Sequence, residues 1–420
     1  MQRLSWRLCT GLLFAAGCLA QSNLPARVLT WQEAEDVFRA NNPNLLAGKE
    51  TIDESKADEI TAYLRPNPNI TLGWDQITLF SSNPYRPFWQ SYIYGNVDYL
   101  HERRHKRELR LASARQATEI AVSAQSDLER NLIFNLRDAF NRVLLAKAVV
   151  GVTKENLEYI DKEIAINKER LRVGDMARVD YQRIDIQRVQ YESDFQTAQV
   201  NLRTAKIDLQ ALLADKTPTD SFDVKGEFDY TDTTIALPDL EKIALSARPD
   251  LKEAEQSLEK SRTDHQLSVA NGSTDPTFGM DGSHQPAPLN TYIGFSVTFP
   301  LRVFDRNQGD KLHTLIDIDR NRKLRNAADI SVLHDVDSAF ATLESTVELL
   351  KPYKSKYLEE ARQIRDTISF SYAHGAASLL DYLDAQKEYR DTELNYVNLV
   401  GSYLAAVNQV NYSVGREVIQ

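Results

Sequence analysis

Residues 102–173 read ERRHKRELRLASARQATEIAVSAQSDLERNLIFNLRDAFNRVLLAKAVVGVTKENLEYIDKEIAINKERLRV. This stretch contains no proline and a single glycine, Gly151, so little in it interrupts an α-helix. At 1.5 Å per residue such a helix spans roughly 105 Å, which is too long for one protomer to cover its apolar stripe. Apolar side chains at spacings of three and four indicate antiparallel coiled-coil packing, with partners from the other half of the chain and from other subunits.

The second half of the chain repeats the first at an offset of about 200 residues, far longer than the period of a solenoid repeat. Asn42-Pro43-Asn44-Leu45 returns as Arg248-Pro249-Asp250-Leu251, and Ala139-Phe140 returns as Ala339-Phe340. Each copy reads as a helix, a β-hairpin, a long helix, a tight turn and a return helix. The expected organisation is a first repeat at residues 21–214, a linker or equatorial insert at 215–237 and a second repeat at 238–420.

Proline and glycine set the ends of the expected helices. Arg65-Pro66-Asn67-Pro68 ends the first one, and Pro352 predicts a kink or short break in the long helix of the second repeat. The small insert between the repeats is expected to be irregular or β-like. The expected helices cover residues 30–64, 102–173, 178–213, 310–373 and 378–414, and the tip turns lie at 174–177 and 374–377.

Each repeat also contains a segment in which the apolar period changes from 3.6 to 2. Residues 68–100 and 275–300 predict hairpins with strands about 8–11 residues long, the length of a tilted membrane-spanning strand. An ordinary half-buried hairpin gives the same alternation. Two hairpins flanked by very long helices behind a signal sequence favour the membrane interpretation. Candidate aromatic belts at the membrane surfaces are formed by Trp74, Trp89, Tyr92, Tyr94, Tyr99, Tyr292, Phe295 and Phe299.

The N-terminus is typical of a secretory signal peptide at residues 1–20. Arg3 and Arg7 precede the apolar residues 8–16. Cleavage after Ala20 is one interpretation, and lipidation of Cys18 at a lipobox-like site is the other. No other stretch approaches the roughly 20 apolar residues that a membrane-spanning helix needs. The net charge of −10 argues against nucleic-acid binding.

His101, Glu102 and His105 spell the H-E-x-x-H signature of zinc proteases. That chemistry needs a helix, a third ligand and a cleft. The neighbouring side chains are positively charged, which opposes Zn²⁺ binding and suits anionic lipid head groups at a membrane boundary instead. We therefore expect no catalytic residue, no metal site and no cofactor. The basic neighbours are Arg103, Arg104, Lys106, Arg107 and Arg110.

Taken together, these segments resemble the TolC family of outer-membrane efflux ducts along essentially the whole mature chain. The resemblance rests on the Arg248-Pro249-Asp250-Leu251 box, the junction Phe299-Pro300-Leu301 followed by residues 304–309, and the two helix turns. It implies a mainly α protein with a membrane β-barrel portion. Three protomers, each with two hairpins, would form a 12-stranded barrel in the outer membrane and an α-helical periplasmic tunnel. The family partners are a periplasmic adaptor and an inner-membrane pump.

The resemblance also marks the helix tips, where Gly174 and Gly375 form the turns. Asp381 and Asp384 share one helix face, and three copies would converge six carboxylates into a ring that favours cations. Solvated helix-turn residues are the alternative interpretation. Ala377 replaces an arginine found in some members, which argues against a salt-bridge latch of that design. Asp180 and Tyr372 complete the expected gate, and the candidates for adaptor contact are Arg172, Asp175, Arg178 and Ala376.

The sequence thus favours a passive trimeric duct of a tripartite efflux system, located in the outer membrane and extending into the periplasm. Such a duct is expected to export small molecules or metal ions and to perform no bond chemistry itself. The junction at residues 304–309 resembles that of the outer components of heavy-metal efflux systems. This slightly favours metal ions as the exported substrate. Two alternatives stay open at this point: a soluble periplasmic coiled-coil adaptor or scaffold, and a zinc metalloprotease that uses Glu102.

Overall fold

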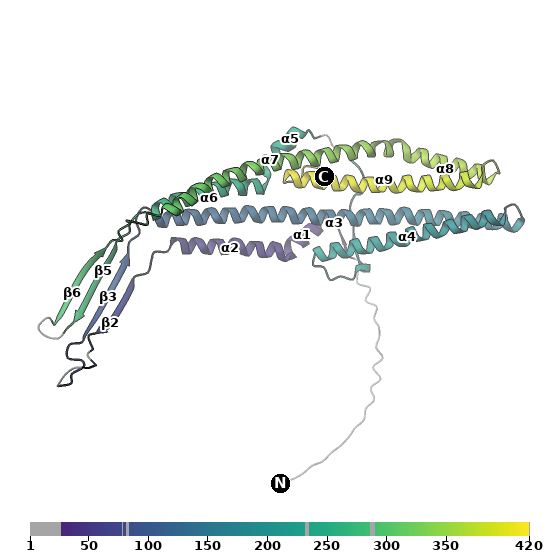
Figure 1. Cartoon of the computed structure of the whole chain (residues 1–420). Helices are drawn as coiled ribbons and strands as arrows, with labels where there is room; N and C mark the ends of the chain where they lie inside the picture. Colours follow the sequence, from purple (N-terminus) through teal and green to yellow (C-terminus); the bar gives the residue numbers. More distant parts are fainter. Residues whose placement is uncertain (1–26, 78, 81–83, 232–234, 286–289, 420) are drawn as a thin grey trace, which may run out of the picture.

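The computed structural model describes residues 27–77, 79–80, 84–231, 235–285 and 290–419. The expected signal peptide and Cys18 lie outside these residues. Described residues form a long rod with a β-sheet at one end and two helix turns at the other (Figure 1). The C-terminus lies near the middle of the rod, beside a belt of short elements.

The first repeat opens with two helices, α1 (Trp31–Asn41) and α2 (Pro43–Tyr63), and the expected single helix at 30–64 is wrong. The break has a local cause. The side chain of Asn42 accepts hydrogen bonds from the backbone N–H groups of Asn44 at 3.0 Å and Leu45 at 3.2 Å, so it caps a new helix. Pro43 occupies the first turn of α2, where a missing N–H costs nothing.

The second repeat breaks at the equivalent place, between α5 (Leu237–Ala247) and α6 (Pro249–Asn271). Arg248 stands between the two helices and is buried. The repeated Asn-Pro and Arg-Pro pairs therefore mark a helix boundary in both copies.

The long helix of the first repeat, α3 (Lys106–Val173), has 68 residues, which corresponds to about 100 Å. It begins four residues later than expected because Arg104 and His105 adopt left-handed backbone angles, with φ of 60° and 54°. The return helix α4 (Arg178–Leu212) begins at the expected residue.

In the second repeat, α7 (Gln308–Pro352) leads into the π-helical turn η2 (Tyr353–Tyr357) and then into α8 (Leu358–Ala373). The break predicted at Pro352 is confirmed. The chain returns in α9 (Leu379–Val414), whose N-cap is Ser378.

The two predicted hairpins form one antiparallel sheet in the order β2-β3-β5-β6. The first hairpin is β2 (Asn69–Asp75) and β3 (Tyr92–Leu100), and the second is β5 (Thr277–His284) and β6 (Thr291–Thr298). The repeats meet where β3 pairs with β5, so β2 and β6 stand at the edges.

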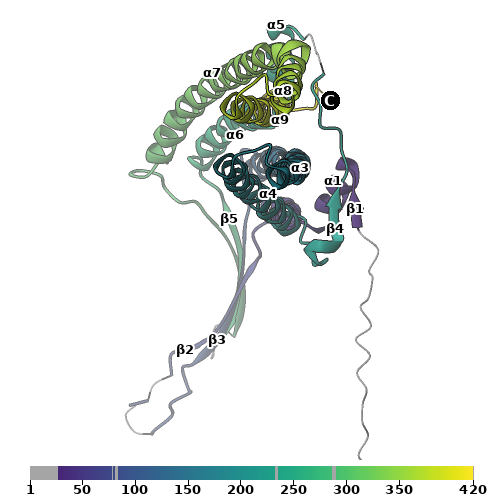
Figure 2. The same cartoon turned by 90° about the vertical axis from the view of Figure 1, so that its right-hand side faces the viewer.

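The insert between the repeats joins the belt. Its short helix η1 (Thr219–Ser221) precedes β4 (Phe222–Val224), which pairs in parallel with β1 (Arg27–Leu29). The expected β-like character is confirmed for this part. In Figure 2, viewed along the rod, β1, β4 and α1 lie at the right of α3 and α4, and α5 lies above α7. These four short elements make up the belt.

The hydrophobic core is also duplicated and lies at the level of the belt. Phe38, Phe140 and Phe222 anchor the cluster of the first repeat, and each is almost completely buried. A second cluster surrounds Leu240 and Val336 between α5, α7 and α9. Each such side chain contributes about 1.5–3 kcal/mol on burial, so the belt is a stable scaffold from which the sheet and the turns project.

Candidate functional site: a two-faced sheet and paired helix tips

Apolar side chains from all four strands lie on one face of the sheet. Strand register places Ile70, Val97, Met280 and Phe295 in one row. These side chains are 39–82% exposed in a single chain, so the described residues leave this face largely uncovered. Neighbouring rows on the same face contain Tyr99, Phe278 and Val297, then Leu72 and Ile293, then Trp74 and Ile93.

The opposite face of the same sheet is mostly polar, although Tyr92, Tyr94 and Tyr292 also lie on it. Its rows contain Asn69, Asp98, Gly279 and Ser296, and then Thr71, Asn96, Asp281 and Gly294. A sheet with one uncovered apolar face and one polar face separates a hydrocarbon phase from water. Within the described chain, no helix combines the length and apolar character required to cross a membrane.

Ion pairs fix the junction between the sheet and the long helices. The buried ammonium of Lys106 contacts Asp275 at 2.5 Å and the Ser273 carbonyl at 3.0 Å. Burial opposes ionisation of Asp275, but the hydrogen bond and charge of Lys106 outweigh it and lower the pKa of this carboxyl. Arg103 adds hydrogen bonds to the Thr274 carbonyl, so the first repeat holds the start of β5 in place.

The H-E-x-x-H segment lies in this junction and lacks the geometry of a zinc protease. Residues 101–105 precede α3 and are not helical. The carboxylate of Glu102 pairs with Arg110 at 2.5 and 2.9 Å. No cluster of three metal-ligating side chains occurs among the residues that the structure describes. The zinc protease alternative requires these residues to lie on a helix, and they do not.

At the other end of the rod, the two turns have the same backbone geometry. Gly174 and Gly375 adopt φ of 83° and 77°, a left-handed conformation that favours glycine. The N–H of Asp175 bonds to the Arg170 carbonyl at 2.8 Å, and the N–H of Ala376 bonds to the Ser371 carbonyl at 2.8 Å. These are equivalent helix-ending motifs, so the duplication extends to the turns.

The expected gate carboxylates have different surroundings. Asp381 lies in a capping box: its carboxylate accepts hydrogen bonds from the Ser378 hydroxyl at 2.7 Å and the Ser378 N–H at 3.1 Å. These bonds lower the pKa of Asp381 and keep it ionised. Asp384 is exposed, and no hydrogen bond or ion pair engages its carboxylate within the described chain. Asp180 is half-buried.

The structure brings Tyr372 into contact with the first repeat. Its ring stacks on Tyr382 at 4.8 Å, and the Arg170 guanidinium lies 5.3 Å from its centroid. Burial raises the pKa of Tyr372, with a further contribution from the charge of Asp180. Beneath this contact, burial raises the pKa of Glu163, whose carboxyl lies against Tyr382. The two tips therefore form one structural unit.

Sequence analysis missed a polar seam between α3 and the α8–α9 pair. The buried amide of Gln386 donates to the Tyr159 hydroxyl at 3.1 Å and to the Ser369 hydroxyl at 3.0 Å. Farther from the tip, Glu393 accepts from Tyr389 at 2.9 Å and from Asn156 at 3.3 Å. A signal was available, because Asn156, Tyr159, Glu163 and Asn167 recur at spacings of three and four.

The predicted adaptor-contact residues lie at the end of the rod and are all exposed. Arg172 pairs with Glu169 at 2.7 Å, and Asp175 pairs with Arg170 at 3.1 Å. Arg178 has no ion pair with any described residue and is the most available cation of this group. Their role in contacting a partner stays a prediction.

Comparison with known proteins finds similarity to one family. Residues 240–416 match the family model described as "Outer membrane efflux protein". The chain is 22% identical over 396 residues to the cobalt-zinc-cadmium resistance protein CzcC of Cupriavidus metallidurans, covering 92% of this chain and 90% of that protein. The chain therefore resembles the outer membrane efflux proteins, and the family match itself covers residues 240–416.

Further similarities point to the same group of proteins. The outer membrane protein TolC of Salmonella enteritidis is 24% identical over 323 residues, covering 70% of this chain and 62% of that protein. The crystal structure of CusC superposes with a TM-score of 0.75 at 17% identity and covers 92% of each chain. The fold class and the family resemblance expected from the sequence are confirmed.

Proposed function

We propose that this protein is a passive duct that three copies of the chain form together in the outer membrane. The supporting observation is the sheet, which has an uncovered apolar face, a polar face and two free edges. Unpaired strand edges are costly in lipid, so β2 and β6 need partners from other chains. Three copies supply 3 × 4 = 12 strands, enough to close a water-filled barrel.

The long helices give the duct its second part. α3 extends about 100 Å away from the sheet and is covered by helices of both repeats on only part of its surface. The remaining surface is available to neighbouring subunits, which extends the tunnel from the outer membrane into the periplasm. A soluble adaptor has the same helices but no need for a sheet with an exposed apolar face.

Conductance in a planar lipid bilayer tests this function, together with cross-linking of the detergent-purified protein. Under an applied voltage, a passive duct produces stepwise increases in ion current without nucleotide, and cross-linking ends at a species of three chains. A protein that stays monomeric and fails to insert refutes the duct and supports the soluble adaptor.

The helix tips are the proposed gate of this duct. Asp384, with an unengaged carboxylate, supplies the cation selectivity, whereas Asp381 mainly caps α9. Asp384→Asn is therefore expected to reduce the cation-to-anion permeability ratio more than Asp381→Asn. The opposite order assigns selectivity to Asp381. The exposed residues around the two turns form the face offered to a periplasmic adaptor and its inner-membrane pump.

Metal ions are a proposed cargo class, because the relative CzcC is named for cobalt, zinc and cadmium resistance. Deletion of the chain's gene, followed by growth in graded concentrations of these metals and of an organic dye, tests the assignment. Sensitivity to the metals alone supports it, and sensitivity to the dye alone contradicts it.

A further inference from the structure

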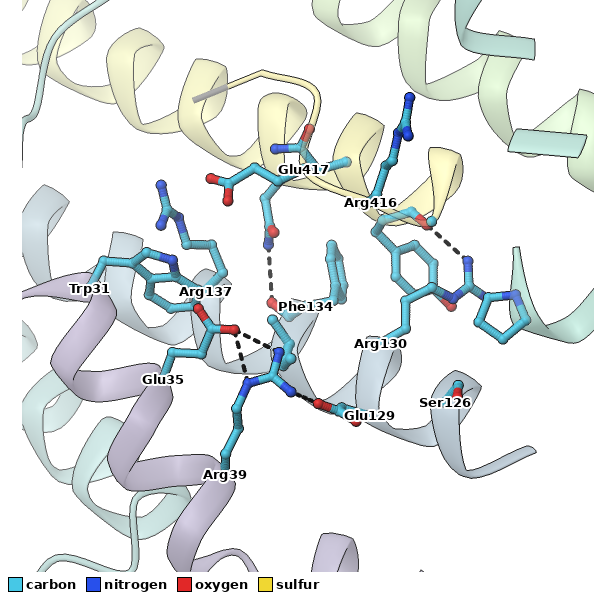
Figure 3. Close-up of a pocket in the computed structure, with 16 residues that line it drawn as sticks. Trp31, Glu35, Arg39, Ser126, Glu129, Arg130, Phe134, Arg137, Arg416 and Glu417 are labelled. Carbon is cyan, nitrogen blue, oxygen red and sulfur yellow. Dashed lines mark hydrogen bonds and ion pairs between the residues drawn. The ribbon is translucent and has the colours of Figure 1, made fainter. Parts of the chain in front are cut away.

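A pocket opens in the belt where the two repeats meet, far from the sheet and from the helix tips. It has a volume of about 410 Å³, within the range of small-molecule sites. α1 and α3 of the first repeat form one side, and the end of α9 with the segment after it forms the other (Figure 3). The rings of Trp31, Phe134 and Tyr412 supply its apolar walls.

Two of the four arginines that line the pocket are engaged by protein groups. Arg39 pairs with Glu35 at 2.7 Å and with Glu129. Arg130 pairs with Asp127 at 2.6 Å and donates to the Tyr412 carbonyl at 2.8 Å. These guanidinium groups build the pocket and are not free to hold a ligand.

Arg137 differs from both. Its guanidinium lies 4.3 Å from the centroid of the Trp31 ring, which holds it by a cation–π contact. Among the described residues, it makes neither a hydrogen bond nor an ion pair. Partial burial lowers its pKa, which is the effect of an incompletely compensated charge. A guanidinium has five N–H donors, so Arg137 has the capacity to bind a carboxylate through two of them.

An unpaired carboxylate lines the same pocket. Glu417 is exposed, makes no ion pair within the described part of the chain, and lies close enough for its charge to act on Arg137 without contact. Glu35 also acts on Arg137. These negative charges disfavour a multiply charged anion such as phosphate beside Arg137. A ligand with one carboxylate and a nearby ammonium suits Arg137 and Glu417.

We propose that this pocket binds a small zwitterion of the amino-acid or dipeptide class with an aromatic side chain. Its carboxylate binds Arg137, its ammonium faces Glu417, and its ring packs against Phe134 and Tyr412. Because the walls come from both repeats, an occupied pocket ties α1 to the end of α9.

Calorimetric titration of the detergent-purified protein with the dipeptide Gly-Phe tests the proposal. Gly-Phe amide lacks the carboxylate, and N-acetyl-Gly-Phe lacks the ammonium. Wild-type protein is expected to bind Gly-Phe with a Kd in the millimolar range or below, and each analogue about tenfold to a hundredfold more weakly.

Arg137→Gln should weaken Gly-Phe binding by the same factor and leave the binding of Gly-Phe amide unaffected. Glu417→Gln should likewise weaken Gly-Phe binding and leave the binding of N-acetyl-Gly-Phe unaffected. Arg142→Gln is the matched control, because Arg142 lies on α3 in an exposed pair with Asp138. The side chain of Glu417 is exposed, so its variant keeps the test valid even where Arg137→Gln fails to fold. Absence of Gly-Phe binding at about 10 mM, or equal binding of the amide, overturns the proposal.

Discussion

Arg248 joins three helices of the second repeat, and its removal has a predictable cost. Only 4% of its side chain is exposed. Its guanidinium donates to Asp250 at 2.6 and 3.0 Å, to Asp335 at 2.8 Å and to the Ser413 carbonyl at 3.3 Å. Arg248→Met keeps a long side chain in the space but leaves two carboxylates without their cation.

The structure sets the magnitude of this loss. Removing one partner of a fully buried ion pair costs about 3–5 kcal/mol. Asp250 and Asp335 retain 31% and 36% exposure, and Arg130 stays 3.8 Å from Asp250. Water and Arg130 therefore offset part of the cost, and we expect Arg248→Met to lower the free energy of unfolding by about 2–3 kcal/mol.

The effect of Arg248 depends on pH with a defined sign. Burial opposes ionisation of Asp250, but hydrogen bonds and charge from Arg248 outweigh it and lower the pKa of Asp250. A carboxyl with a lowered folded pKa contributes stability above its unfolded pKa of about 3.9 and loses that contribution as the pH falls through the folded value. The difference between wild type and Arg248→Met is therefore full at pH 7 and shrinks below about pH 4.

Denaturant unfolding in detergent, followed by circular dichroism, measures both effects. Arg262→Met is the matched control, because Arg262 lies on the same helix α6 with 52% exposure and pairs with Glu259 at 2.9 Å. This control is expected to change stability by less than about 0.5 kcal/mol. A loss for Arg248→Met no larger than that of Arg262→Met at pH 7 refutes the reasoning.

Two further predictions concern the sheet and the second tip. Phe295→Arg puts a cation on the apolar face and is expected to cost about 2–4 kcal/mol of stability in lipid vesicles, whereas Ser296→Arg on the polar face costs less than about 1 kcal/mol. Equal losses in denaturant titrations contradict the assignment of the faces. Ser378→Ala removes the capping box of α9 and is expected to cost about 1 kcal/mol, seen as faster hydrogen exchange in its first turn. Ala177→Ser, at the uncapped equivalent position of α4, should slow exchange there, and unchanged rates in both variants contradict the capping account.

The sequence predicted the helices and strands better than the boundaries between them and the pairing of distant strands. Long stretches free of proline set the helices, and Pro352 marked the π-helical turn correctly. The break at Asn42 was missed because the apolar stripe continues across it, although Asn42 followed by Pro43 has the pattern of an N-cap and a first helical residue. Pairing of β3 with β5 joins residues far apart in the chain, so alternation within each hairpin does not specify it.

At the tips, the sequence located the turns but not the roles of their side chains. Ser378 and Asp381 have the spacing of a capping box, so the local role of Asp381 was readable. The stacking of Tyr372 on Tyr382 could not be predicted from the sequence, because it depends on how α8 packs against α9 and α3. The polar seam around Gln386 was not predicted, because apolar spacing on α3 indicates the contact of α3 with α4 and not its polar contacts with α8 and α9.

Accessibility scanning along β5 tests the central claim most directly. Nitroxide labels at residues 278, 279, 280 and 281 of the full chain in lipid vesicles report contact with oxygen, which concentrates in lipid, or with a water-soluble nickel chelate. The account predicts that labels replacing Phe278 and Met280 meet oxygen, and that labels replacing Gly279 and Asp281 meet nickel. Equal access of nickel to all four labels would contradict a sheet with one face in lipid and the other in a shared aqueous pore.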